Sequence, residues 1–355
     1  MKNIFKQIMK DKYASVALII LLVMYLMILF ANFISPYSKD FADRNQSYAP
    51  PSKVFIIDEN GKLSKPYTYN YKREYMPELY QTVYKLDRSH KYYIHFLNRG
   101  ETYKFLGIIK TSRHLFGVEK EGRLYILGTD INGRDVFSRL LFGGRISLTI
   151  GFLSLFILFP IGLIYGGISG YFGGWVDIIM MRFAEAVMAI PSFYLLIILA
   201  AILPSNMTST QRFTLIVIIL ALIGWSGFAR VVRGMVLSIK KEEFVLAAKT
   251  IGASDLRIIL KHILPQTTSY VIIAMTLSVP SYILAESGLS FLGLGIQQPD
   301  ASWGNMLKEA QEYINILYRP WLLTPGFLIF IAVLSFNVIG DTIRDILDPK
   351  GKMRE

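Results

Sequence analysis

The stretch Glu242–Gln266, EEFVLAAKTIGASDLRIILKHILPQ, is a polar interval between two long apolar segments of the chain. Its first part, Phe244–Lys249, consists mainly of good helix formers. Gly252 then interrupts the helical pattern, as a residue that readily takes positive φ does at a helix end. Ser254 and Asp255 can cap a second helix, so the stretch predicts a short helix–turn–helix displayed at a membrane surface.

The predicted second helix is amphipathic, and it ends where the next apolar segment begins, at Pro265. Its apolar residues recur at the spacing of one helix face: Leu256, Ile259, Leu260 and Ile263. The basic residues of the stretch are Lys249, Arg257 and Lys261. An amphipathic loop lying on lipid headgroups has the same pattern, so the pattern alone leaves both interpretations open.

The composition is that of an integral membrane protein, with 53% hydrophobic and 18% charged residues over 355 positions and a mean hydropathy of +0.40. The net charge of +12 does not indicate nucleic-acid binding, because Lys and Arg cluster at the ends of apolar segments, as in cytoplasmic loops. The absence of cysteine excludes disulfides and Cys-based metal sites. We predict no metal site from the scattered histidines, which are His90, His95, His114 and His262.

Six apolar segments are long enough to cross a bilayer as helices, and we place them at 13–34, 146–170, 177–203, 213–229, 267–285 and 321–340. The first follows a lysine-rich N-terminus, 1–12, and exceeds the apolar core of a cleaved signal peptide, so we expect a signal anchor. With the N-terminus in the cytoplasm, 230–266 and the C-terminal tail 350–355 also face the cytoplasm. The basic clusters fall mostly on these inner segments.

Residues 35–127 differ in character from the rest of the chain, because they are polar and rich in Tyr and Lys. Short alternating runs between turn signals predict strands at Lys53–Asp58, Tyr67–Tyr71, Tyr92–Leu97 and Tyr103–Ile109. We therefore expect an extracytoplasmic β-rich domain inserted after the first span. The sequence leaves open whether this domain contacts a binding protein or only shields a gate.

Three charged residues near the spans are candidates for a gate or pathway. Arg182 and Glu185 are three residues apart and can pair on one helix face. Glu286 closes the fifth span, which we expect to be interrupted at Pro280, and a carboxylate at such a place is a functional candidate by default. Anchoring is the plainer interpretation of Arg182 and Glu185, whereas for Glu286 a snorkelled or paired carboxylate and a gate or pathway role are equally good interpretations.

Glycines recur every four residues along the second span and just beyond it, at Gly162, Gly166, Gly170 and Gly174. Small residues at this spacing let two helix backbones approach closely in a membrane. The pattern predicts a helix-packing face.

The stretch 242–266 resembles the EAA loop of ABC-importer permeases, whose pattern is E-A-A, three residues, G-A, and then I, H and L-P. The matching positions are Ala247, Ala248, Gly252, Ala253, Ile258, His262, Leu264 and Pro265. The leading Glu of the motif is replaced by Leu246, although Glu242 and Glu243 precede it, and the final Asn is replaced by Gln266. Three further stretches, Leu127–Leu148, Gly288–Gly304 and Arg344–Pro349, resemble signatures of the dipeptide and oligopeptide branch of these permeases.

The resemblance implies an all-α polytopic fold of the type I ABC importer permeases, with a permease core over 128–349 and the β-rich insertion. It implies one half of a translocation pathway for peptides in the cytoplasmic (inner) membrane, worked by alternating access. The implied partners are a second, different permease subunit, two ATP-binding subunits, an extracytoplasmic solute-binding protein and membrane lipid. Glu243 and the matching residues of the loop would dock on an ATP-binding subunit.

The chain itself carries no nucleotide site of the GxxxxGK[ST] kind and no catalytic constellation, so we predict a transport subunit and not an enzyme. ATP and Mg²⁺ would be used by the partner subunits. An ion-coupled secondary transporter using Glu286 or the Arg182/Glu185 pair is the alternative, but internal repeats typical of such carriers are not evident. A scaffold or sensor without transport activity would leave the match at 246–265 unexplained.

Overall fold

The computed structural model describes residues 2–59, 61–76, 81–105, 107–119, 121–204 and 206–347. The chain forms two compact units. Unit 1 comprises Met1–Leu21, Leu148–Leu289 and Phe330–Glu355, and unit 2 comprises Leu22–Ser147 and Ser290–Ile329. The predicted tail 350–355 and the last residues of the Arg344–Pro349 motif lie outside the described residues.

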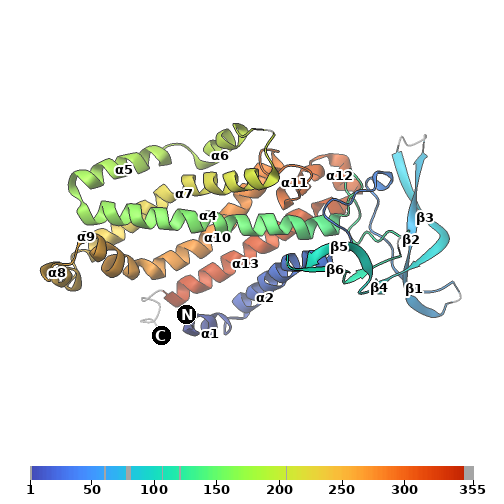
Figure 1. Ribbon diagram of the computed structural model, residues 1–355, viewed down its shortest axis with the longest axis horizontal. Helices are drawn as coiled ribbons and strands as arrows, with labels where there is room; N and C mark the ends of the chain where they lie inside the picture. The colour runs from blue at the N-terminus through green and yellow to red at the C-terminus, as the bar shows by residue number, and fades with distance from the viewer. Residues whose placement is uncertain are drawn as a thin grey trace. The chain divides into compact units, whose positions relative to one another are not determined.

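The described part of the chain is mostly helical (Figure 1). The α-helices are α1 Lys2–Ile8, α2 Lys12–Leu29, α3 Ala31–Ile34, α4 Val136–Phe172, α5 Gly174–Met188, α6 Ser192–Ala201, α7 Ser209–Ile239, α8 Glu243–Thr250, α9 Asp255–Arg257, α10 Thr268–Phe291, α11 Trp303–Leu307, α12 Tyr313–Tyr318 and α13 Thr324–Leu347. Within the described ranges, five helical stretches are long and apolar enough to cross a membrane: Lys12–Leu29, Val136–Phe172, Ser209–Ile239, Asp255–Phe291 and Pro320–Leu347. The pair α5 and α6 makes a sixth if it counts as one span.

Several helices extend beyond the predicted spans, because hydropathy marks the apolar part of a helix and not its polar ends. α4 begins at Val136, well before residue 146. A carboxylate oxygen of Asp135 caps its first turn by accepting a hydrogen bond from the Ser138 N–H at 2.8 Å. α7 continues to Ile239, so that Arg230 and Arg233 are helical.

Two predicted spans differ from the structure in their breaks. The third is not one helix over 177–203, since α5 and α6 meet at 74°. Pro191 lies at this break, where proline lacks an N–H and disfavours a helical conformation in the residue before it. The predicted interruption at Pro280 and end at Glu286 are wrong, because α10 runs unbroken to Phe291. Membrane helices tolerate proline where neighbouring groups satisfy the freed backbone.

Unit 1 includes α4 from Leu148 onward, α5 and α7, which run alongside one another (Figure 1). The glycine stripe lies where α4 meets α7. A Cβ built there would approach Phe228 Cδ1 to 2.5 Å, the Ala229 carbonyl oxygen to 2.4 Å and the Arg233 carbonyl oxygen to 2.8 Å, at Gly162, Gly166 and Gly170 respectively. The packing prediction is therefore confirmed for these three positions. Gly174 instead begins α5 with φ +55° and has open space around it.

Unit 2 contains the strands, and all of their pairings are antiparallel. β1 Phe55–Ile57, β2 Leu63–Met76 and β3 Gln81–Tyr93 form one sheet in that order. β4 His95–Phe96 pairs with β7 Phe116–Gly117, and β5 Arg99–Phe105 pairs with β6 Ile109–Arg113. The side chains of Tyr67, Tyr69 and Tyr71 are buried along β2.

The strand predictions were right about the region and partly wrong about the breaks. The predicted strand Tyr103–Ile109 is in fact the end of β5, a turn and the start of β6. Gly107 has φ +79° in that turn, a conformation that favours glycine. The predicted strand Tyr92–Leu97 is likewise divided, between the end of β3 and β4.

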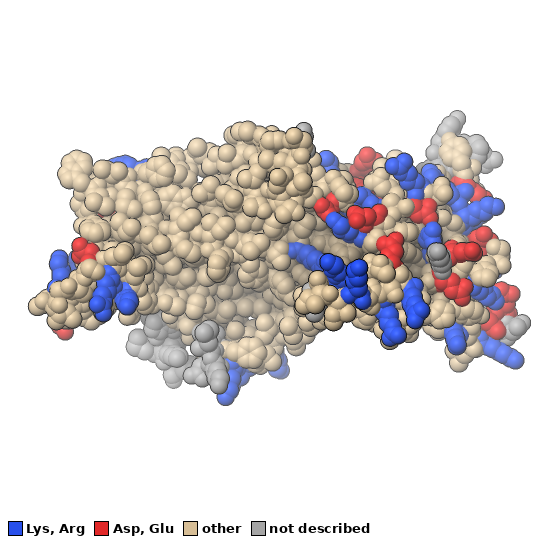
Figure 2. Space-filling model, in the orientation of Figure 1, with Lys and Arg blue, Asp and Glu red and all other residues tan. Residues whose placement is uncertain are grey.

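Charged side chains are distributed very differently in the two units (Figure 2). On the face drawn, basic and acidic side chains are both numerous over the strands of unit 2. The middle of the unit 1 helices shows almost no charged side chains on that face. An uncharged helical surface is the kind that lipid can surround.

Candidate functional site

The polar interval in unit 1 contains a turn built on one glycine. After α8, the Gly252 N–H donates to the Lys249 carbonyl at 3.0 Å and the Ala253 N–H donates to the Ala248 carbonyl at 3.1 Å. These two bonds are those of a Schellman motif, which requires a left-handed residue between them. Gly252 has φ +82°, as predicted, and a Cβ there would meet no atom within 4 Å.

The backbone after the turn differs from the prediction of a separate, capped second helix. Ser254 occupies the N-cap position of α9, but its side chain makes no capping hydrogen bond. The short α9 continues as a π-helical segment, Ile258–Ile263, and a 3₁₀ segment, Leu264–Thr267, into α10. The whole of Asp255–Phe291 is therefore one continuous helical stretch.

The predicted apolar stripe is divided between the inside and the outside of unit 1. Ile259 and Ile263 are buried, together with Ile258, whereas Leu256 and Leu260 are exposed. A π-helix has more residues per turn than an α-helix, and this change of period moves the buried face.

We call residues 242–266 the coupling segment. Its exposed side carries several large apolar side chains. Ile251, next to the turn, is 84% exposed. The other exposed large apolar residues are Phe244, Leu246, Leu256 and Leu260. The basic residues Lys249, Arg257 and Lys261 are exposed as well. So many exposed apolar side chains on one short segment are typical of an interaction site.

The residues predicted to dock on an ATP-binding subunit lie on this segment at different depths. Ile258 and Ala248 are buried. Half-buried positions are Ala253, His262 and Leu264, and exposed positions are Glu243, Ala247, Gly252 and Pro265. The role of these residues in coupling remains a prediction.

Two side-chain contacts join the C-terminal end of α4 to the coupling segment and to Lys240, which lies two residues before it. The Tyr171 hydroxyl donates to Asp255 Oδ1 at 2.6 Å, and Lys240 Nζ donates to the Gly170 carbonyl at 2.8 Å. Both contacts engage the C-terminal end of α4, where unpaired carbonyls accumulate. The sequence analysis missed them, because no local spacing links residues so far apart.

A partly buried ion pair joins α5 to α7 next to these contacts. Asp177 Oδ1 accepts from Arg233 Nε at 2.9 Å and from the Ser169 hydroxyl at 2.5 Å. Asp177 is only 8% exposed. The sequence places Asp177 and Arg233 at the ends of two spans, which is the only signal that could have suggested the pair.

The predicted gate candidates lie in different surroundings. Arg182 and Glu185 form the predicted pair, at 3.0 Å, on an exposed face of α5. Glu286 is fully buried within α10, with the Ser287 hydroxyl 3.4 Å from its Oε2. Whether any of these residues acts in a gate remains a prediction.

In unit 2, two stretches that resembled permease signatures meet in one polar cluster. Arg134 Nε lies 2.6 Å from Asp130 Oδ2, and Arg134 Nη1 donates to Gln298 Oε1. Arg139 Nη1 donates to the Pro299 carbonyl at 3.0 Å, and Glu309 Oε2 accepts from the backbone N–H of Ile131 at 3.1 Å. We call Asp130, Arg134, Arg139, Gln298 and Glu309 the motif cluster.

Burial changes the acidity of carboxyl groups in and beside the motif cluster. It raises the pKa of Asp135 to about 7, against the opposing effect of hydrogen bonds from Ser138. Burial, helped by the negative charge of Asp130, also raises the pKa of Glu309 to about 7. Both groups therefore change protonation near neutral pH.

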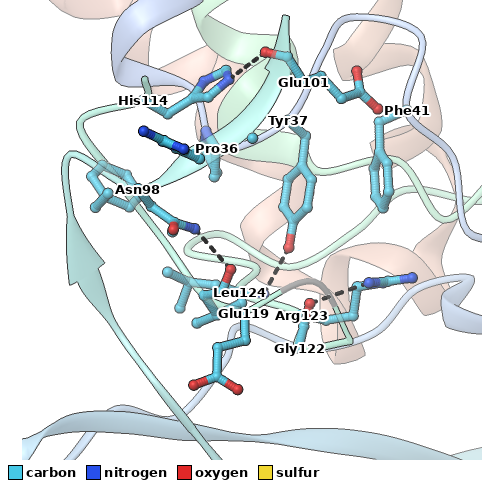
Figure 3. A pocket seen from close by; sticks show the side chains of 15 residues that line it. Pro36, Tyr37, Phe41, Asn98, Glu101, His114, Glu119, Gly122, Arg123 and Leu124 are labelled. Atoms are coloured by element: carbon cyan, nitrogen blue, oxygen red, sulfur yellow. Dashed lines mark hydrogen bonds between the residues drawn. The ribbon is translucent and has the colours of Figure 1, made fainter. Parts of the chain in front are cut away.

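The hollow drawn in Figure 3 is a poor candidate for a solute site. It has a volume of about 360 Å³ and lies in unit 2. Its polar groups already serve the fold: Asn98 donates to the Val118 carbonyl, the Tyr37 hydroxyl accepts from the Leu124 N–H, and Arg123 pairs with Asp43.

The chain is similar over most of its length to known transport proteins. Residues 159–352 match the family described as "Binding-protein-dependent transport system inner membrane component", and residues 1–51 match "N-terminal TM domain of oligopeptide transport permease C". A dipeptide transport system permease protein of Bacillus subtilis is 48% identical over 225 residues, which cover 63% of this chain and 68% of that protein. An oligopeptide transport system permease protein of Haemophilus influenzae is 44% identical over 229 residues, covering 64% and 71%.

Proposed function

Because this chain belongs to the family of binding-protein-dependent transport system inner membrane components, we propose that it is one permease subunit of an ATP-driven importer. It is a multi-pass protein of the inner membrane. In the proposal it forms half of the translocation pathway, and it has no nucleotide site of its own. ATP and Mg²⁺ are bound and used by two partner subunits.

One observation carries the coupling part of the proposal, namely the exposed apolar surface of the coupling segment around Ile251. Such a surface is stabilised when a partner covers it. We assign the groove of an ATP-binding subunit as that partner. Motion of the groove reaches the spans through the contacts of Asp255 with Tyr171 and of Lys240 with the end of α4.

The transported solute in this proposal is a peptide, since similar permeases are named for dipeptide and oligopeptide transport. Both termini lie in the cytoplasm, and the strand-bearing insertion of 35–127 lies outside it, next to a solute-binding protein. A second, different permease subunit completes the pathway. The ion-coupled alternative is not favoured, because the chain matches permeases of binding-protein-dependent transport systems.

Co-purification tests the proposal. The tagged chain is extracted in mild detergent from its own cells, and every protein recovered with it is identified. We expect two Walker-motif ATPases and a second six-span permease. Recovery of the chain alone, while it still transports a labelled peptide in proteoliposomes, would overturn the proposal.

A matched pair of variants locates the ATPase contact. Ile251 and Leu63 are exposed to almost the same extent, 84% and 86%, but Leu63 begins β2 in unit 2. We expect Ile251→Ser to reduce recovery of the ATPases and Leu63→Ser to leave it unchanged. Equal recovery with both variants would remove the coupling segment from the interface.

A further inference from the structure

The β5–β6 hairpin of unit 2 has an apolar tip that no described part of the chain covers. The tip sequence is Phe105-Leu106-Gly107-Ile108-Ile109, of which Leu106 lies outside the described residues. Ile108 is 83% exposed and Ile109 is 64% exposed. Moving large aliphatic side chains out of water lowers the free energy, so the tip would be stabilised by entering an apolar phase.

Below the tip, the hairpin places like charges opposite each other. Lys104 pairs in register with Lys110, and Arg99 pairs with Arg113. All four are exposed, and none makes an ion pair with another residue of the described ranges. Directly opposed like charges destabilise a strand pair, unless an anionic partner lies against them.

A second pair of opposed lysines in unit 2 shows the contrast. Lys72 of β2 lies opposite Lys85 of β3, but Glu74 holds Lys85 at 2.7 Å. Among the described residues, a counter-charge is present in the β2–β3 hairpin and absent at Lys104 and Lys110. An anionic surface outside the chain would supply one for the β5–β6 hairpin.

The position of the hairpin identifies the partner. The Phe105 ring stacks on Phe30 with a centroid distance of 5.7 Å and meets Phe33 edge-on at 6.3 Å. Phe30 directly follows α2, a candidate membrane span, and Leu26 and Leu29 of that span are exposed in the same unit. Figure 1 shows β5 and β6 beside this end of α2, apart from β2 and β3.

A buried histidine fixes the hairpin in this position. The His114 ring lies between two backbone carbonyls, with Nδ1 2.7 Å from Ser35 O and Nε2 3.0 Å from Glu101 O (Figure 3). Ser35 follows α3, and Glu101 belongs to β5. The hairpin is thus held against the end of the span at two places. His114 fixes its base, and Phe105 fixes the strand end next to its tip.

We propose that the β5–β6 hairpin is an interfacial membrane anchor. Its tip, Ile108 and Ile109, enters the lipid at the level where α2 ends, and Lys104 and Lys110 contact anionic phosphates above it. The occupant is an anionic lipid surface, because apolar side chains ringed by extended basic ones match the boundary between acyl chains and headgroups. The anchor depends on α2 crossing the membrane and not on the transport activity.

Labelling at a single cysteine tests insertion, since the chain contains no cysteine of its own. Ile108→Cys carries an environment-sensitive NBD label, and Leu63→Cys, which is equally exposed, is the control. The full chain with its partners is placed in nanodiscs of phosphatidylethanolamine and phosphatidylglycerol. We expect blue-shifted emission and strong quenching by doxyl lipids labelled near the headgroup for position 108, and water-like emission for position 63.

Two results would overturn the anchor. The first is the same water-like emission from both positions. The second is a shielded label at position 108 that doxyl lipids do not quench, because a protein partner would then cover the tip.

Removal of the two lysine charges tests whether anionic lipid headgroups contribute to insertion. The measured quantity is the ratio of inserted to exposed hairpin. In phosphatidylglycerol nanodiscs, Lys104→Ser/Lys110→Ser should lower this ratio by about fivefold per lysine. In phosphatidylcholine nanodiscs, the double variant should have little effect. The control is Lys72→Ser/Lys85→Ser on the β2–β3 hairpin, which should change neither. An equal loss in both lipids would contradict the role of anionic headgroups.

Discussion

At the scale of single residues, the coupling segment depends most clearly on Gly252. Its left-handed φ completes the Schellman motif that ends α8, and the space around its Cα is open. A Cβ at this position would therefore meet no atom of the described residues within 4 Å. A longer side chain would project toward whatever covers the turn.

We predict that Gly252→Asp abolishes peptide uptake while leaving the chain folded. Aspartate visits the left-handed region more readily than most residues, so the backbone penalty stays below roughly 1–2 kcal/mol. The loss comes instead from the fit between the turn and the ATP-binding subunit. Uptake of labelled peptide into proteoliposomes and thermal unfolding of the purified chain together measure the two effects.

Gly252→Asn separates shape from charge in this experiment, because asparagine has nearly the same shape as aspartate and is neutral. Gly227→Ala in α7 is the control for glycine replacement, since its added Cβ also meets nothing within 4 Å and its φ is not left-handed. Normal uptake by the Asp variant would remove the turn from the coupling interface.

The two ion pairs of α5 give a second prediction at this scale. Asp177→Asn should lower the free energy of unfolding by about 1–3 kcal/mol, because it leaves Arg233 partly buried without its carboxylate. Arg182→Ala breaks the exposed pair with Glu185 and should change stability by about 0.5 kcal/mol or less. Thermal unfolding in detergent compares them, and equal effects would show that burial does not decide the strength of these pairs.

At the scale of elements, α4 and α7 are held at a distance that only glycine permits. We predict that Gly166→Ala destabilises the chain by roughly 1–3 kcal/mol, because the new Cβ would lie 2.4 Å from the Ala229 carbonyl oxygen and would push the helices apart. Gly234→Ala in α7 meets nothing and should be neutral or stabilising by up to about 1 kcal/mol. Thermal unfolding midpoints measure both changes.

The same elements show what a sequence can and cannot predict. Long apolar runs predict that α4, α7 and α13 exist, because a membrane requires helices of that length. Their breaks depend on whether neighbouring groups satisfy the freed backbone, so the predicted break at Pro280 and the predicted unbroken course through Pro191 were both wrong. The two prolines look alike in sequence and act differently in their surroundings.

The sequence likewise predicted only part of the candidate site. Local chemistry indicated the turn at Gly252, because a left-handed residue is a property of the chain itself. The contact of Tyr171 with Asp255 and the pair of Asp177 with Arg233 join distant segments, so no local pattern indicated them. The exposure of Leu256 and Leu260 followed from a π-helical segment that the i, i+4 spacing does not reveal.

At the scale of the whole molecule, the protonation of a few buried groups affects the stability of the entire chain. Asp135 and Glu309, both in unit 2, have pKa values raised to about 7, whereas carboxyl groups of unfolded chains titrate near about 4. The folded state therefore binds more protons than the unfolded state across this window. The free energy of unfolding falls as pH rises from about 4 to about 7, and it levels off above that.

We predict that Asp135→Asn makes the thermal stability of the chain less dependent on pH over this window, by a difference on the order of 2–4 kcal/mol between its ends. Asparagine keeps the oxygen that accepts from the Ser138 N–H, so the cap of α4 survives the change. The measurement is the unfolding midpoint in detergent at a series of pH values, for the variant and the parent chain. Glu74→Gln is the control, because its ion pair with Lys85 lowers the pKa of Glu74, opposite in direction to the raised pKa of Asp135. An Asp135→Asn curve parallel to that of the parent would show that Asp135 is ionised throughout and that the polar surroundings of the cluster outweigh its burial.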